Sequence, residues 1–206
     1  MEQKKDHDTE RMILDAAERL FLEKGFAMTS TIEIAKEANC NQALVHYYFR
    51  SKENLFQSIF EKKIKILVSN FEENSQKELT FEERVTQTIE SHFEMVRANP
   101  RLPFLIFNEL ITNPSRLNSL KEKIIELPKA VLILLQNELR KEVEVGRVHP
   151  MEITDLILSI ISLNVMLFLT SPIWKTITGM SDEDFEALVE HRKKEHVRII
   201  LASLKP

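Results

Sequence analysis

Glycine and cysteine are scarce in this sequence, which holds three glycines and one cysteine among its 206 residues. Gly25, Gly146 and Gly179 lie far apart, so they cannot form a phosphate-cradling loop or a dinucleotide-binding fingerprint. The single Cys40 excludes an intrachain disulfide framework and favours a reducing, cytoplasmic compartment. We interpret Cys40 as a small buried hydrophobic residue rather than as a redox sensor.

The residue patterns of a metal site and of a catalytic centre are also missing. His191 and His196 are close in sequence, but at five residues apart they lie on different faces of a helix. No serine stands in a nucleophile elbow. Carboxylate pairs such as Glu82-Glu83 stand at expected helix starts, where they favour the helix dipole. We therefore predict no metal, no cofactor and no enzymatic activity.

Neither an excess of positive charge nor a clear membrane span is present. The net charge of −4 means that any DNA-binding charge must be concentrated on one surface. The N-terminal residues are too polar for a secretion signal. Residues 156–174 are uncharged, but serine, asparagine, threonine and proline interrupt the run. We predict a helix buried on every side, against the core and a partner subunit, and no membrane association.

What the sequence does contain is helical periodicity, and residues 30–52 have the pattern of two short helices joined by a tight turn. Ser30 and Glu33 form a capping box that begins the first helix. Asn39 suits the left-handed conformation that ends this helix, and Asn41 can cap the next one. This spacing is typical of a helix-turn-helix, whose second helix enters the major groove of DNA.

The second helix of this motif has two different faces. At about 100° per residue, three larger side chains point inward: Val45, Tyr48 and Phe49. Ala43 and Tyr47 point outward, and Gln42 lies in the first turn, where it can pair with adenine while apolar groups contact thymine methyls. No acidic residue stands between Glu37 and Glu53 to repel phosphates. The outward face therefore suits base edges.

Residues 11–26, 29–35 and 46–55 resemble, in order and spacing, the DNA-binding domain of TetR/AcrR-type transcriptional repressors. The resemblance covers roughly residues 9–60. It implies DNA contacts from nine residues: Thr29, Ser30, Thr31, Gln42, Ala43, Leu44, His46, Tyr47 and Lys52.

The chain is accordingly expected to be all-α, with two domains. Residues 1–50 are predicted to form an N-terminal three-helix helix-turn-helix domain, with the start of a linking helix to about residue 60. Residues 51–206 are predicted to form a larger helical domain for effector binding and dimerisation. Its two C-terminal helices carry apolar stripes suited to a four-helix homodimer interface.

A ligand pocket in the larger domain is a further hypothesis, although the same side chains could be plain core. Aromatic and sulfur-containing residues could form the wall, and polar residues could anchor the ligand. The candidates are His92, Phe93, Phe104, Phe107, Asn108, Asn164, Met166, Phe168 and Trp174.

The leading hypothesis is a homodimeric repressor that binds a pseudo-palindromic double-stranded DNA operator and is released by a small, mostly apolar effector. The alternative is a DNA-anchored protein-interaction module without a small-molecule effector. A helical enzyme is the third reading, and no residue constellation supports it.

Overall fold

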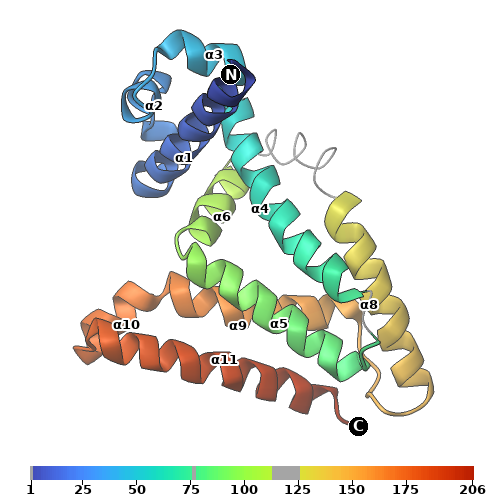
Figure 1. Ribbon diagram of the computed structural model, residues 1–206. Helices are drawn as coiled ribbons and strands as arrows, with labels where there is room; N and C mark the ends of the chain where they lie inside the picture. The colour runs from blue at the N-terminus through green and yellow to red at the C-terminus, as the bar shows by residue number, and fades with distance from the viewer. Residues whose placement is uncertain (1, 76–77, 113–125) are drawn as a thin grey trace. The chain divides into compact units, whose positions relative to one another are not determined.

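The described part of this computed structural model, residues 2–75, 78–112 and 126–206, consists of helices and contains no strand (Figure 1). The predicted all-α fold is thus confirmed. In chain order the helices are α1 (Glu2–Met28), α2 (Thr31–Glu37), α3 (Gln42–Phe49), α4 (Lys52–Ser75), α5 (Phe81–Ala98), α6 (Leu102–Thr112), α8 (Glu126–Glu144), α9 (Ile153–Leu169), α10 (Ser171–Thr178) and α11 (Asp182–Leu204).

The chain divides into two compact units. The first unit comprises residues 1–65 and 104–124, and the second unit comprises residues 66–103 and 125–206. Helices α4 and α6 each contribute residues to both units.

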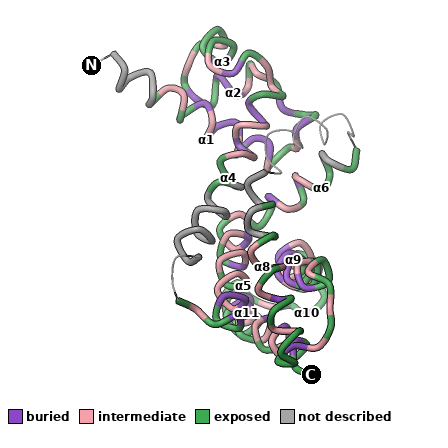
Figure 2. The backbone as a smooth tube through the Cα atoms, turned by 90° about the vertical axis from the view of Figure 1, so that its right-hand side faces the viewer, coloured by how far each residue is buried: buried purple, intermediate pink, exposed green. Residues whose placement is uncertain are grey.

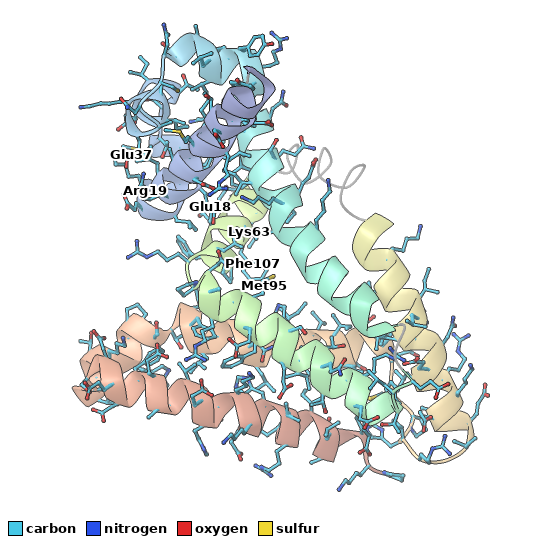
Figure 3. The ribbon with its side chains drawn as sticks, viewed as in Figure 1. Glu18, Arg19, Glu37, Lys63, Met95 and Phe107 are labelled. Carbon is cyan, nitrogen blue, oxygen red and sulfur yellow. The ribbon has the colours of Figure 1, made fainter. Side chains whose placement is uncertain are left out.

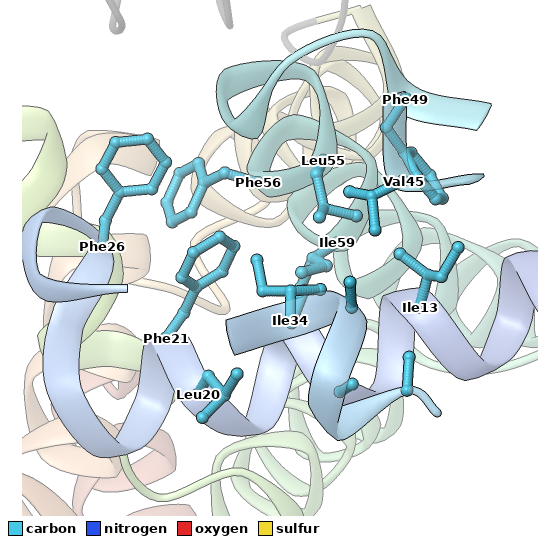
Figure 4. Packing of buried hydrophobic residues seen from close by; sticks show 14 of the residues in the cluster. Ile13, Leu20, Phe21, Phe26, Ile34, Val45, Phe49, Leu55, Phe56 and Ile59 are labelled. Carbon is cyan, nitrogen blue, oxygen red and sulfur yellow. The ribbon is translucent and has the colours of Figure 1, made fainter. Parts of the chain in front are cut away.

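Helix α1 is broken close to its C-terminal end. It starts at Glu2, and its helical geometry is interrupted at Gly25, where φ is 80°. Because a positive φ costs glycine little, the chain can turn there. Phe26 then folds back into the core, with its ring centroid 5.3 Å from that of Phe21 and 5.4 Å from that of Phe56 (Figure 4).

The core of the first unit is built from apolar side chains of α1, α2, α3 and α4 (Figure 4). Ile13, Ile34 and Leu55 are completely buried in it. Half-buried Cys40 packs against this core, and burial raises the pKa of its thiol. A raised pKa keeps the thiol protonated and unreactive, which agrees with the interpretation of Cys40 as a small hydrophobic residue.

The second unit packs α5, α9 and α11 against one another, and α8 packs against α5 and α9. Buried residues lie along these helices (Figure 2). Pro128 lies in the first turn of α8, where its missing N–H has no helical partner to lose. Ser181 is the N-cap of α11, and its hydroxyl accepts from Asp184 N.

The long uncharged run does not form one helix. Helix α9 ends at Leu169, and α10 follows with Pro172 in its first turn. Of the helices in the described ranges, none alone is long and apolar enough to cross a membrane. Helices α9 and α10 are long and apolar enough only when taken together, and the chain bends by 52° between them.

Candidate nucleic-acid interface

Helix α3 is held by a tight turn and by its own N-cap, as predicted. Asn39 has a φ of 50°, and the side chain of Asn41 accepts a hydrogen bond of 2.9 Å from the backbone N–H of Ala43. Val45 and Phe49 are buried against the core of the first unit. These contacts fix which face of α3 remains open.

The open face of α3 carries Ala43, Leu44, His46 and Tyr47, all of which are exposed. Tyr47 has 62% of its surface exposed and lies edge-on to Tyr48 at 5.1 Å between ring centroids. Leu44 and Tyr47 are thus exposed on a helix whose opposite face is buried. We call Gln42, Ala43, Leu44, His46 and Tyr47 the reading face.

Gln42 and His46 both have hydrogen-bond partners within the first unit. The Gln42 Nε2 donates to Thr31 Oγ1 at 3.1 Å, which joins the start of α3 to the start of α2. His46 Nδ1 lies 3.0 Å from the carbonyl oxygen of Arg50. Because a carbonyl can only accept, Nδ1 must carry the proton and Nε2 points away from this bond.

Thr29 and Lys52 differ from what the resemblance implies, because the structure uses both side chains internally. Thr29 is only 1% exposed, and its hydroxyl lies within hydrogen-bond distance of two carbonyl oxygens of α1. Lys52 Nζ donates to the carbonyls of Phe26 and Thr29, each at 2.9 Å, and lies 4.2 Å from the centroid of the Phe26 ring. Both side chains hold the helices together and neither belongs to the reading face.

Ser30 is exposed, but its hydroxyl serves the capping box at the start of α2. It accepts from Glu33 N at 3.2 Å and donates to the Glu33 carboxylate at 3.0 Å. The Lys24 ammonium donates to the same carboxylate at 2.9 Å. The hydrogen bonds from Lys24 and Ser30 lower the pKa of Glu33 to about 2.

Ion pairs also connect α1 to α2 and α4 in the first unit (Figure 3). Arg19 pairs with Glu37 at 2.5 Å, and Lys63 pairs with Glu18 at 2.6 Å. With Lys24 and Glu33 included, each of the α2 acids is paired with a cation of α1. Their negative charge is thus partly neutralised close to the helix-turn-helix.

The predicted ligand-pocket residues are divided between the two units. Phe104, Phe107 and Asn108 are exposed on α6 in the first unit. Met166 and Trp174, in the second unit, are 49% and 50% exposed. The remaining four lie together inside the second unit: His92, Phe93, Asn164 and Phe168.

Two members of that group, His92 and Asn164, form a polar cluster with His196 that connects α5, α9 and α11. Asn164 Nδ2 donates to the Ile89 carbonyl at 2.9 Å and lies 3.0 Å from His92 Nδ1. Asn164 Oδ1 lies 2.8 Å from His196 Nδ1. Because the amide oxygen can only accept, His196 Nδ1 is protonated. Burial lowers the pKa of both His92 and His196 to about 4.

His196 is the member of this cluster that the sequence-based prediction missed. A signal was available, because His196 lies seven residues after Val189 and four before Ile200, on the apolar stripe of α11. Its Nε2 is buried and has no hydrogen-bond partner among the residues that the structure describes.

A separate pocket of about 520 Å³ lies in the second unit between the start of α5 and the end of α8. Its wall includes Glu82, Glu138 and Lys141, together with the ion pair of Glu142 and Arg147. A wall with this many charges is not the apolar pocket that the sequence predicts.

Comparison with known proteins connects this geometry to transcription factors. Residues 13–59 match the family model of bacterial regulatory proteins of the tetR family. The fatty acid metabolism regulator protein of Bacillus subtilis (strain 168) is 28% identical over 66% of this chain and 69% of its own length.

Solved structures extend the likeness to the whole chain. The crystal structure of HlyIIR, a hemolysin II transcriptional regulator, is 26% identical with a TM-score of 0.67, over 98% of this chain and 99% of that one. FadR from Bacillus subtilis, in complex with stearoyl-CoA, is 22% identical with a TM-score of 0.62, over 91% of this chain and 97% of that one.

Proposed function

Because this chain belongs to the TetR/AcrR family of transcriptional regulators, we propose that it is a sequence-specific repressor that works as a homodimer and is released by a small, mostly apolar ligand. The observation that carries the DNA-binding part is the reading face, where Leu44 and Tyr47 stand exposed on a helix fixed by buried Val45 and Phe49. Such a helix is preorganised for the major groove.

Dimerisation is supported by apolar side chains that the second unit leaves exposed near its C-terminal helices. Leu158 and Met166, on α9, are 56% and 49% exposed, and Ile173 and Ile177, on α10, are 58% and 70% exposed. A second copy packed on these side chains would remove them from water. Two reading helices about 34–36 Å apart would then occupy successive major grooves of a pseudo-palindromic operator.

The effector is proposed to act on the second unit. We take a long-chain acyl-CoA as the first ligand to test, since one relative is a fatty acid metabolism regulator and a protein of similar fold was crystallised with stearoyl-CoA. Binding would favour a dimer with the wrong separation of reading helices. A coupling of roughly 1–3 kcal/mol, or 5- to 150-fold in DNA affinity, is typical of such a switch.

The test is a titration of the full chain onto fluorescent duplexes from its own upstream region and onto scrambled duplexes, at several salt concentrations. Specific repression requires tighter binding to the upstream DNA at every salt concentration. Gln42→Ala and Tyr47→Ala should reduce this specific binding without changing helix content or oligomeric state. Equal affinity for both duplexes would contradict the proposal.

The ligand part is tested by adding stearoyl-CoA to the specific complex, with free CoA as the control. Release by stearoyl-CoA alone supports an acyl effector.

Exposed apolar residues on α10, including Trp174, favour a second candidate function, in which the second unit recruits another protein and no small effector acts. That candidate predicts unchanged DNA affinity with every acyl-CoA tested.

A further inference from the structure

We propose that the reading face selects an A·T-rich half-site. In this half-site Gln42 reads an adenine, Ala43 and Leu44 contact thymine methyl groups, and Thr31 positions the Gln42 amide. This inference rests on the proposed function, because it names the class of DNA sequence that the same surface would select.

The orientation of the Gln42 amide determines which base it can read. One N–H of Nε2 is used by Thr31 Oγ1 at 3.1 Å, and the side chain is half-buried. Its other N–H and its Oε1 remain for a ligand. A donor beside an acceptor matches adenine, which presents N7 as acceptor and N6–H as donor in the major groove. Guanine presents two acceptors, so Oε1 would face another oxygen.

The side chains that usually read guanine are missing from this surface. Guanine is most often bound by arginine or lysine in bidentate fashion, and α3 contains neither from Gln42 to Phe49. Lys52 is turned inward to two backbone carbonyls. Arg50 stands at the C-cap, about 12 Å along the helix from Gln42.

Besides Gln42 Oε1, the reading face offers a second hydrogen-bond acceptor, Nε2 of His46. In the tautomer whose Nδ1 donates to the Arg50 carbonyl, Nε2 carries no proton and can accept. An acceptor in the major groove suits the amino groups of adenine and cytosine and is repelled by guanine O6 and N7. His46 lies four residues after Gln42, about 6 Å along the axis, which is close to two base-pair steps of about 3.4 Å.

The apolar part of the reading face points to thymine. Ala43 is exposed, and Leu44 has 37% of its surface exposed. The C5-methyl of thymine is the apolar group that the bases present in the major groove. Contact with it would remove both side chains from water, and the neighbouring adenine would satisfy Gln42.

The experiment begins with selection of bound duplexes from a random library by the full chain at one fixed salt concentration. The expected consensus contains A·T pairs at the positions whose selection is lost in Gln42→Ala and Leu44→Ala. Gln42→Ala should reduce discrimination at a single base pair by roughly 5- to 150-fold. A consensus with guanine at the Gln42-dependent position would overturn this inference alone, whereas no consensus at all would overturn the proposed function as well.

Base analogues in the selected duplex then test the individual contacts. Replacement of the adenine by 7-deazaadenine, which lacks the N7 acceptor, should weaken the wild type several-fold and leave Gln42→Ala unaffected. Replacement of thymine by uracil removes one methyl and should weaken the wild type by about 4-fold, but not Leu44→Ala. If wild type and variants respond alike to the analogues, the assigned contacts are wrong.

The positioning role of Thr31 is tested by replacing its hydroxyl with a methyl group of similar size. Thr31→Val should lose discrimination at the same base pair as Gln42→Ala, while Thr31→Ser, which keeps the hydroxyl, should retain it. The exposed Thr154 on α9 provides the control variant Thr154→Val. Unchanged discrimination in folded Thr31→Val would contradict the positioning role.

Discussion

The two units of this chain are stabilised by cores of different chemistry. The core of the first unit is a cluster of aliphatic and aromatic side chains around Phe21, Phe26 and Phe56. The second unit encloses Asn164 and His196, together with an ion pair of 2.9 Å between Arg84 Nε and Glu138 Oε2. Both units have apolar clusters that depend on packing, but the second unit adds buried polar groups that are stable only while each keeps its partner.

This difference matches the tasks that we propose for the two units. A reading face must keep one geometry, and close packing without buried charge resists change. A unit that responds to a ligand needs two packing arrangements of its helices that differ little in free energy. The buried Nε2 of His196, which has no partner in the described residues, is a place where the second unit is incompletely satisfied.

The largest effect is expected in the apolar core. Phe21→Ala removes a side chain that is 1% exposed, and the cavity should cost about 3–5 kcal/mol in the free energy of unfolding. Met12, on the same helix, is 48% exposed, so Met12→Ala should change the free energy of unfolding by about 0.5 kcal/mol or less. Urea denaturation followed by circular dichroism measures both, and equal losses would mean that the packing around Phe21 is loose.

The polar cluster of the second unit should be almost as sensitive, for another reason. Asn164→Ala leaves His196 Nδ1–H and His92 Nδ1 without partners, which should cost about 3 kcal/mol. The exposed Ser162 on α9 supplies the control Ser162→Ala, with almost no expected change.

A double variant separates desolvation from packing in this cluster. Adding His196→Phe to Asn164→Leu replaces both hydrogen-bonded partners by apolar groups, so the pair should be less destabilised than the sum of the two single variants. Strict additivity would show that Asn164 and His196 do not depend on each other.

The two cores should also differ in their response to acid. His92 and His196 have a pKa of about 4 in the folded protein, below the ordinary value of 6.5. The unfolded chain therefore binds protons first as the pH falls, and stability decreases from about pH 6.5 towards pH 4. The midpoint of thermal unfolding should fall by several degrees between pH 6.5 and 4.5.

His196→Phe should reduce this pH dependence, and His191→Gln, at an exposed position on α11, should not. Above pH 4.5 most carboxylates remain ionised, which isolates the histidines in this range. An unchanged slope in His196→Phe would refute the assignment of the acid sensitivity to the second unit.

Local features of the first unit could be predicted from sequence because they depend on residues close together. The caps at Ser30 and Asn41 follow from spacings of two or three residues, and the burial of Val45 follows from helical period. The same holds for the break of α1 at Gly25.

Features that depend on distant residues could not be predicted in this way. Thr29 and Lys52 lie in stretches that resemble DNA contacts, yet Lys52 reaches carbonyls 23 and 26 residues away. His196 pairs with Asn164 across 32 residues, which no local spacing indicates. Helical period predicts which face of a helix is buried, but not which buried side chains of two helices meet.

The smallest expected effect compares the same capping chemistry in both units. Ser30 and Thr80 each begin a helix through a complete capping box, so Ser30→Ala and Thr80→Ala should each cost about 1 kcal/mol in the free energy of unfolding.

The Ser30 and Thr80 variants should differ in their effect on DNA binding. Ser30 precedes Thr31, the hydrogen-bond partner of Gln42, so loss of the cap should loosen the reading face and weaken specific DNA binding. Thr80→Ala should leave that affinity unchanged, as measured by fluorescence anisotropy on the selected duplex. If both variants bind DNA like the wild type at equal loss of stability, the orientation of Gln42 does not depend on how α2 begins, and the rigidity ascribed to the first unit comes from its apolar core alone.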